Sequence, residues 1–166
     1  KTNPEAYAEL VGWARQVWPE MAVSTDVIVG FPGESEQDFE ESLEFVKKMN
    51  FASGHVFSFS PRAGTPAAAY PGQVHPTVRK ERSARMRAVL AESGAAYRQK
   101  FVGRTVGVLW EAASGLGPEG WQMEGLSDQY LHVRAISPIN AWNRIQNVRL
   151  MELEGEWLNG IIEAES

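Results

Sequence analysis

The 166-residue chain contains no cysteine. Disulfide bonds and metal sites held by thiolates are therefore excluded within these residues. Its three histidines, His55, His75 and His132, are too scattered to predict a metal site. No run approaches the roughly 18 apolar residues of a membrane-spanning helix, so we expect no membrane association. The polar start of the sequence predicts no signal peptide, and nothing in it indicates export.

The net charge of −5 hides an uneven distribution of charged residues. Residues 1–61 carry 4 basic and 10 acidic side chains, residues 62–104 carry 9 and 2, and residues 105–166 carry 3 and 9. A basic band between two acidic regions is typical of a surface that binds a polyanion. It is also typical of a solvated helix face that pairs with acidic neighbours, which charge alone favours slightly without excluding the first interpretation.

Helices and strands alternate in the first part of the chain. Apolar spacing, capping residues and prolines predict helices that begin at Asn3, Ser35 and Pro76 and strands over 23–30 and 55–60. The apolar run 27–29 predicts a first strand that is buried on both faces. Such alternation indicates a parallel sheet with right-handed crossovers. Because two strands are too few for a stable parallel sheet, we interpret residues 1–102 as part of a larger α/β domain.

The pattern changes after Gly103, where short strands follow one another. They are predicted over 105–110, 121–124, 129–135, 147–153 and 157–162. Five short strands with turn signals between them predict a small β-barrel of the oligonucleotide-binding kind. We therefore expect a domain boundary between residues 102 and 103.

Two loops carry the most specific signals for function. The segment 24–34 (STDVIVGFPGE) predicts a strand, a glycine turn and a helix start, the arrangement by which α/β enzymes bring backbone against a small ligand. The segment 60–66 (SPRAGTP) follows the second predicted strand. Both loops fall at the same end of a parallel sheet, where ligands of α/β proteins bind.

These two segments, with His55-Val56-Phe57 between them, resemble the C-terminal half of the radical SAM methylthiotransferases. Residues 103–166 resemble the TRAM domain that ends those enzymes. Within the family, His55-Val56-Phe57 and the segment 125–130 (GLSDQY) most resemble the branch that acts on N6-threonylcarbamoyladenosine 37 of tRNA. The alternatives are the branch that acts on N6-isopentenyladenosine 37, and an RNA-binding module without catalysis.

The resemblance implies a fold and a set of partners. It implies the C-terminal part of a partial (β/α) radical SAM barrel over 1–102 and a five-stranded barrel over 103–166. It also implies S-adenosylmethionine and two 4Fe–4S clusters in a parent enzyme whose N-terminal half supplies the cluster cysteines. We expect no catalytic residue and no metal ligand in this chain, which should be inactive alone. The implied partners are the tRNA anticodon stem-loop and the N-terminal half, in the cytoplasm.

Three residues are implied to bind the cofactor: Ile28, Gly30 and Phe57. In radical SAM barrels the strand that corresponds to 23–30 passes under the adenine, where Ile28 would pack on the base. Gly30 would let the backbone approach closely, since glycine has no Cβ. This sequence departs from the family pattern G-x-I-x-G-x-x-E, because Asp26 occupies the first position and Glu34 lies one residue later than the pattern's glutamate.

Arg62 and Thr65 are the candidate substrate residues of the second loop. A guanidinium at Arg62 would grip a carboxylate or phosphate through two parallel hydrogen bonds. We expect Thr65 to support the loop by hydrogen bonding and to lie against the substrate. The alternative for Arg62 is an ordinary surface arginine.

The long basic helix and the barrel are the remaining candidates for tRNA binding. Arg79, Arg82 and Arg104 would contact phosphates and give salt-dependent affinity. Trp121 and Tyr130, and also Trp142, would stack on unpaired bases, although aromatic residues of small barrels usually belong to the core. The acidic balance of residues 105–166 weakens this prediction.

Overall fold

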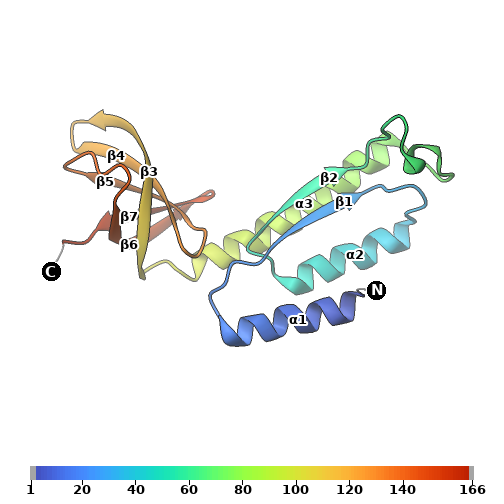
Figure 1. Cartoon of the computed structure of the whole chain (residues 1–166), viewed down its shortest axis with the longest axis horizontal. Helices are drawn as coiled ribbons and strands as arrows, with labels where there is room; N and C mark the ends of the chain where they lie inside the picture. The colour runs from blue at the N-terminus through green and yellow to red at the C-terminus, as the bar shows by residue number, and fades with distance from the viewer. Residues whose placement is uncertain (1–2, 165–166) are drawn as a thin grey trace. The chain divides into compact units, whose positions relative to one another are not determined.

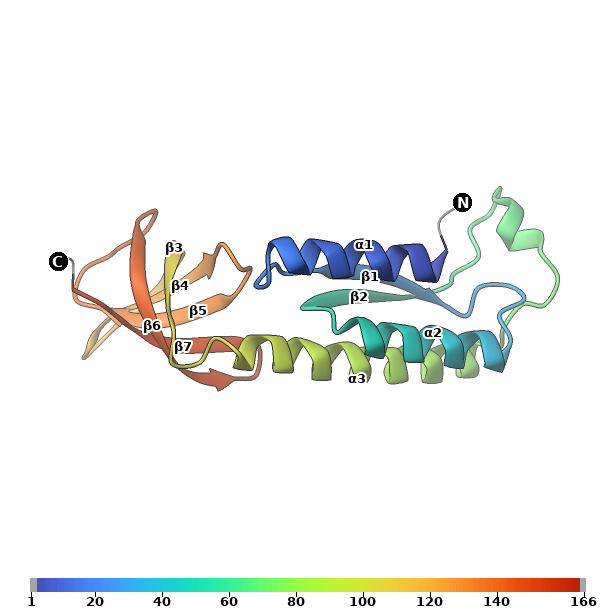
Figure 2. The same cartoon turned by 90° about the horizontal axis from the view of Figure 1, so that it is seen from below.

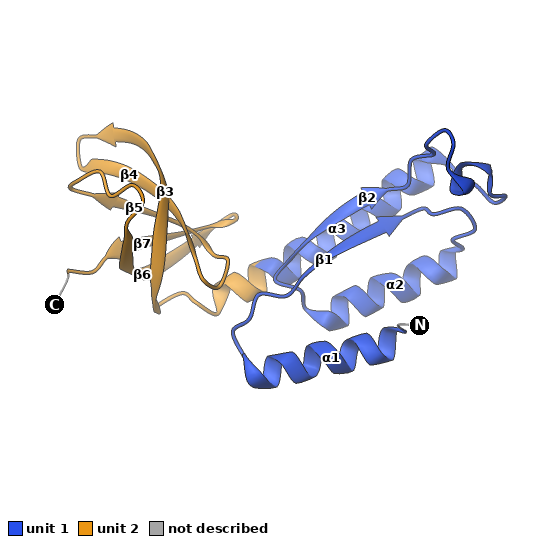
Figure 3. Cartoon of the chain, in the orientation of Figure 1, with its two compact units in different colours: residues 1–94 blue, residues 95–166 orange. Residues whose placement is uncertain are grey.

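The computed structural model describes residues 3–164. The chain divides into two compact units, Lys1–Gly94 and Ala95–Ser166 (Figure 3). This division falls inside the long helix α3 (Pro76–Gln99), whereas the sequence places a boundary between 102 and 103, just before the first strand of the barrel. Each unit has its own sheet and its own core.

The first unit contains the predicted alternation of helices and strands (Figure 1). Its elements are α1 (Pro4–Val17), β1 (Ser24–Val29), α2 (Glu36–Met49), β2 (Ser53–Ser58), the short 3-10 helix η1 (Pro66–Ala69) and α3. The predicted caps are confirmed. The Asn3 side chain accepts from the Ala6 amide at 2.8 Å, and Ser35 forms a capping box with Asp38.

Strands β1 and β2 pair in parallel, from Ser24 opposite Ser53 to Val29 opposite Ser58. Val11 of α1, Phe39 of α2 and Met86 of α3 join one buried cluster. Val27 and Val56 pack against this cluster, so the three helices cover the same face of this sheet. Helix α2 lies beside α3 (Figure 2). Ile28 and Phe57 point to the other face and are 56% and 53% exposed. The prediction that the first strand is buried on both faces was therefore wrong, because the helices of this chain cover one face only.

The second unit is a closed five-stranded barrel with the order β3-β4-β5-β7-β6, which confirms the predicted barrel. Its strands are β3 (Thr105–Gly117), β4 (Gly120–Ser127), β5 (His132–Ser137), β6 (Ile145–Glu154) and β7 (Trp157–Ile162). Strand β3 continues seven residues beyond the predicted 105–110, since its second half pairs with β4 across two irregular positions. The interior is filled by fully buried side chains that include Trp110, Met123 and Leu150.

Two parallel strands do not make a (β/α) barrel, so the radical SAM barrel implied by the resemblance stays a prediction. The five-stranded unit is consistent with a TRAM-like domain. Among residues 3–164, no helix has the length and apolar character needed to cross a membrane.

Candidate functional site

The loops that follow β1 and β2 meet at the carboxyl ends of the two strands. The Gly33 amide donates to the Gly72 carbonyl oxygen at 2.9 Å. The Phe31 ring lies edge-on to Phe59 at 5.2 Å between centroids, and Tyr70 lies 6.4 Å from Phe31. Ligands of α/β proteins bind at this end of the sheet, so we take the joined loops as the candidate site.

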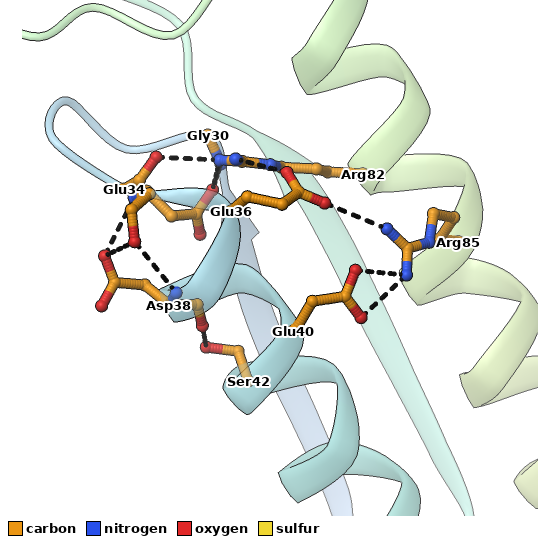
Figure 4. Close-up of polar contacts among 9 residues, drawn as sticks. Gly30, Glu34, Glu36, Asp38, Glu40, Ser42, Arg82 and Arg85 are labelled. Atoms are coloured by element: carbon orange, nitrogen blue, oxygen red, sulfur yellow. Dashed lines mark hydrogen bonds and ion pairs between the residues drawn. The ribbon is translucent and has the colours of Figure 1, made fainter.

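The side chain of Glu34 stabilises the first loop through hydrogen bonds. Its Oε2 accepts from the Gly30 amide at 2.6 Å and from Nη1 of Arg82 at 2.7 Å (Figure 4). The same Nη1 also donates to the Glu34 carbonyl oxygen at 3.0 Å. The side chains of Arg82 and Glu34 are 6% and 12% exposed. The acid that stands one residue late in the family pattern therefore supports the turn.

The ion pairs continue from Arg82 along α2. Arg82 Nη2 contacts Glu36 at 2.8 Å, and Arg85 contacts Glu36 at 3.3 Å and Glu40 at 2.6 Å (Figure 4). The hydrogen bond from Arg82 lowers the pKa of Glu36 below its ordinary value. Burial alone would lower the pKa of Arg82, but hydrogen bonds from it to Glu36 and Glu34 outweigh burial and raise that pKa.

These pairs support the second interpretation of the basic band, in which arginines neutralise acidic neighbours. Arg82 is 5% exposed and already bonded to two carboxylates. The structure therefore does not place it where a tRNA phosphate can reach it. The sequence missed this because Glu34 lies 48 positions away, beyond the reach of helical spacing rules.

Gly30 is buried and has a φ of +72°, a conformation that favours glycine. A Cβ at this position would overlap the side chain of Arg79, which itself donates to the Phe59 carbonyl oxygen. Backbone conformation and the packing of Arg79 thus explain the glycine without a ligand. Arg79, expected to contact phosphate, is half-buried and bonded to the second loop.

The uncovered face of the sheet brings two of the predicted cofactor residues together. Ile28 and Phe57 are register partners on β1 and β2, and the His55 ring lies 6.3 Å from that of Phe57. Half-exposed apolar side chains of this kind fit the planar adenine of S-adenosylmethionine. An iron–sulfur cluster does not fit, because the chain has no cysteine, and residues 3–164 hold no group of three or more side chains suited to a metal.

The second loop positions Arg62 at the same end of the sheet. The Thr65 hydroxyl donates to the Arg62 carbonyl oxygen at 2.8 Å, and the Thr65 amide donates to the same oxygen at 3.1 Å. The expected hydrogen-bond support from Thr65 is therefore confirmed. Arg62 is exposed.

The barrel presents the predicted stacking residues unequally. Tyr130 is 73% exposed and Trp142 is 64% exposed, whereas Trp121 is half-buried. The Trp142 indole donates to the Glu111 carbonyl oxygen at 3.1 Å, which fixes its ring against the barrel. The Arg104 guanidinium lies 5.2 Å from the centroid of the Phe101 ring.

A groove of about 540 Å³ on the barrel was missed by the sequence analysis. Its lining comes from β3, β4, β5 and β7 and includes Gln122, Glu124, Arg134, Ile136 and Asn159. Arg134 pairs with Glu124 at 3.0 Å and stacks on the ring of Trp157 at 3.9 Å. Barrels with this strand order bind oligonucleotides on the face of their second and third strands, here β4 and β5. The alternation over 129–135 was the one available signal, since it marks Arg134 as outward-facing.

The fold defines a class of protein in which an α/β unit, with a candidate ligand site at its strand ends, precedes a barrel of the oligonucleotide-binding type. No family model matches the chain. It is 32% identical over 162 residues, 98% of its length, to the tRNA-2-methylthio-N(6)-dimethylallyladenosine synthase of Ehrlichia canis. Synthases of the same name from Bacillus velezensis and Anoxybacillus flavithermus are 34% and 36% identical to it over all 166 residues.

These homologues are methylthiotransferases, and they support the methylthiotransferase family for this chain. The chain spans about a third of the length of these curated relatives, between 31% and 37%. Their names contain dimethylallyladenosine, which is the isopentenyl branch that the sequence analysis kept as its alternative. The interpretation of segments 55–57 and 125–130 as marks of the threonylcarbamoyl branch is not supported.

Proposed function

We propose that this chain is part of a radical SAM tRNA methylthiotransferase that acts on N6-dimethylallyladenosine. The observation that carries the proposal is the extent of the similarity. Synthases of that name align with 98% to 100% of the chain, so both the α/β unit and the barrel are included. The dimethylallyl branch is favoured over the threonylcarbamoyl branch because the relatives carry the former in their names.

The residues of this chain would bind and orient, and the cluster ligands would come from other parts of the protein. S-adenosylmethionine, when bound, supplies the radical and methyl chemistry of this family. Ile28 and Phe57 would lie against its adenine, since both are half-exposed on the uncovered sheet face. Arg62 would bind a tRNA phosphate, because a dimethylallyl group offers no carboxylate.

The barrel would hold unpaired nucleotides of the tRNA. The groove over β4 and β5 offers Gln122, Glu124 and Asn159 to base edges, beside the stacked pair of Arg134 and Trp157. This same surface favours a second candidate function, an RNA-binding module without chemistry. The two candidates differ in whether the complete protein produces a methylthiolated nucleoside.

The deciding experiment uses the complete protein, reconstituted with iron and sulfide without oxygen and supplied with S-adenosylmethionine and a chemical reductant. It is given tRNA that carries dimethylallyladenosine, tRNA that carries threonylcarbamoyladenosine, and unmodified tRNA. Mass spectrometry of digested nucleosides should show the methylthio product with the first substrate only. A product from the second substrate would restore the threonylcarbamoyl branch, and binding of tRNA without any product would favour the RNA-binding module.

Arg62→Lys tests the substrate side of the site, because lysine cannot reproduce the planar fork of a guanidinium. In one assay, methylthiolated tRNA should fall more than 5′-deoxyadenosine. Equal loss of the two products would place Arg62 at the cofactor. Loss of neither would make it an ordinary surface residue.

A further inference from the structure

Helix α3 reaches both loops of the candidate site with two arginines. Arg79 and Arg82 are three residues apart and therefore share one side of the helix. Arg79 donates to the Phe59 carbonyl oxygen in the loop after β2. Arg82 donates to the Glu34 carbonyl oxygen at 3.0 Å and to the Glu34 carboxylate at 2.7 Å in the loop after β1. One helix thus contacts the carboxyl end of each strand.

The two loops are also joined to each other. The Gly33 amide donates to the Gly72 carbonyl oxygen at 2.9 Å, and the Gly30 amide donates to the Glu34 carboxylate at 2.6 Å. The lack of a side chain at Gly30 leaves the space that Arg79 fills. The loops and the two guanidinium groups therefore form one hydrogen-bonded assembly behind the strand ends.

Burying the guanidinium of Arg82 costs free energy, and the apolar core of the unit does not need this side chain. Arg82 is 5% exposed, although the unit already has a core of apolar side chains from all three helices. A buried arginine is tolerated when its charge is paired and its donors are bonded. Arg82 Nη1 donates to the Glu34 carbonyl oxygen and to the carboxylate that holds the Gly30 amide, and Nη2 donates to Glu36, while Nε is buried without a hydrogen-bond partner within residues 3–164. The hydrogen bonds of Arg82 therefore act mainly on the geometry of the loops and less on the free energy of unfolding.

We propose that Arg79 and Arg82 are positioning residues, a clamp by which α3 holds both loops in the conformation that receives the ligand at the strand ends. Neither residue touches the ligand. The clamp acts through Gly30 and Phe59, which lie two residues beyond Ile28 and Phe57. The identity of the ligand as S-adenosylmethionine rests on the proposed function, whereas the clamp itself rests on the contacts above.

The test compares Arg79→Lys and Arg82→Lys in the complete protein. Both variants keep the charge, so that Glu34 stays paired, but they lose the forked geometry. Arg85→Gln is the matched control. It removes an arginine of the same helix that pairs with Glu36 and Glu40 and bonds to neither loop.

The first readout is amide hydrogen exchange, which does not depend on activity. Exchange in segments 29–35 and 59–73 should quicken about tenfold in both lysine variants, the factor expected when a charge-assisted hydrogen bond is lost. Exchange in residues 40–49 of α2, beyond the Arg82–Glu36 pair, should stay unchanged, as should both loops in Arg85→Gln. Unchanged loop exchange in the lysine variants, or the same acceleration in the control, would overturn the clamp.

The second readout is the binding of S-adenosylmethionine. Its dissociation constant should rise about tenfold in Arg82→Lys. The turnover rate at saturating cofactor should change less than the KM, because the clamp positions the site without taking part in the reaction. Faster loop exchange with unchanged cofactor affinity would overturn the link to the ligand. A parent protein that binds no S-adenosylmethionine would refute the proposed function, and the exchange result would still decide the clamp.

Discussion

The sheets of the two units differ in their edges, because the barrel is closed and the two-stranded sheet is open. Each strand of the barrel pairs with a neighbour on both sides, since the order β3-β4-β5-β7-β6 closes on itself. Within residues 3–164, β1 and β2 pair only with each other and leave one face uncovered. A closed barrel has no free edges, whereas a two-stranded sheet relies on what packs around it.

The difference shows where specificity of structure comes from in each unit. The barrel is defined by its own interior, with Trp110 and Met123 fully buried. The first unit needs side chains from its helices to order its loops, as Arg79 and Arg82 of α3 do. Both units expose large apolar side chains, among them Trp13 of α1 and Tyr130 of the barrel, at 65% and 73%. Changes inside the barrel should therefore act on stability, and changes at the strand-end loops should act on local geometry.

The largest expected effect is that of Trp110→Ala. Trp110 is fully buried, and its indole donates to Gln146 at 2.8 Å. The substitution should lower the free energy of unfolding of the barrel by about 3–5 kcal/mol. Trp142→Ala, at a site 64% exposed, should cost less than about 1 kcal/mol. Denaturant unfolding followed by NMR signals of each unit provides the measurement, and equal destabilisation of the first unit would break the comparison.

Gly30→Ala should have the next largest effect, with Gly64→Ala as its control. Both glycines have positive φ, +72° and +83°, but a Cβ at Gly64 would meet nothing within 4 Å. Gly64→Ala should cost about 1 kcal/mol from backbone strain alone. Gly30→Ala should cost about 2–4 kcal/mol, because the new methyl group also overlaps Arg79.

The excess cost at Gly30 can be assigned by a double-mutant cycle. In an Arg79→Ala background, Gly30→Ala should cost no more than Gly64→Ala, since the overlapping side chain is gone. Chemical denaturation of the four variants gives the coupling energy. An excess that persists without Arg79 would show that another neighbour sets the requirement for glycine.

Local signals in the sequence predicted the local structure well. Asn3, Ser35 and Asp38 cap helices through hydrogen bonds that span three residues, which sequence spacing can identify. Alternating apolar residues likewise predicted five strands. The pairing of Arg82 with Glu34 joins positions 48 residues apart, and the exposure of Ile28 depends on which face the helices cover. Neither the Arg82–Glu34 pair nor the exposure of Ile28 produces a local pattern in the sequence.

The sequence predicted where the two loops of the candidate site lie but not the side chains that support them. The two loops were expected at the strand ends, and Thr65 was expected to brace its loop, as it does at 2.8 Å from the Arg62 carbonyl oxygen. The basic residues of α3 were assigned to tRNA because the sequence shows their charge but not their direction. Arg79 and Arg82 turn toward loop carbonyl groups instead.

Ser35→Ala tests the cap of α2 and should have a smaller effect. The Ser35 hydroxyl accepts from the Asp38 amide at 3.1 Å. Its loss should lower the free energy of unfolding by about 1 kcal/mol at neutral pH, as thermal unfolding would measure. Ser42→Ala is the control, because the Ser42 hydroxyl only donates to a carbonyl within the helix. It should leave stability unchanged or slightly raised.

The same variant has a defined pH dependence. Hydrogen bonds from Ser35 lower the pKa of Asp38 below its ordinary value of 3.8 in the folded protein. This contribution is therefore present above pH 3.8 and is lost as pH falls through the folded pKa. In Ser35→Ala the pKa of Asp38 should rise toward 3.8, which a carboxyl NMR titration would detect. A gap between variant and parent that stays constant into strong acid would contradict this.

The smallest expected effect on stability is that of Tyr130→Gly, which should stabilise the barrel whereas the other test substitutions destabilise the protein. Tyr130 is 73% exposed and has a φ of +57°, a left-handed conformation that disfavours an aromatic residue. Tyr130→Gly should therefore raise the free energy of unfolding of the barrel by about 0.5–1 kcal/mol.

If Tyr130 stacks on a tRNA base, the same variant should bind tRNA at least about fivefold more weakly, with an unchanged salt dependence because stacking releases no counterions. Asn143→Gly, at a φ of +59°, is the control, since asparagine tolerates this conformation and offers no ring. Thermal unfolding and fluorescence anisotropy titrations at several salt concentrations measure the two effects. A more stable variant with weaker tRNA binding would show that the barrel retains a strained aromatic for recognition, whereas unchanged affinity would show that Tyr130 does not contribute to RNA binding.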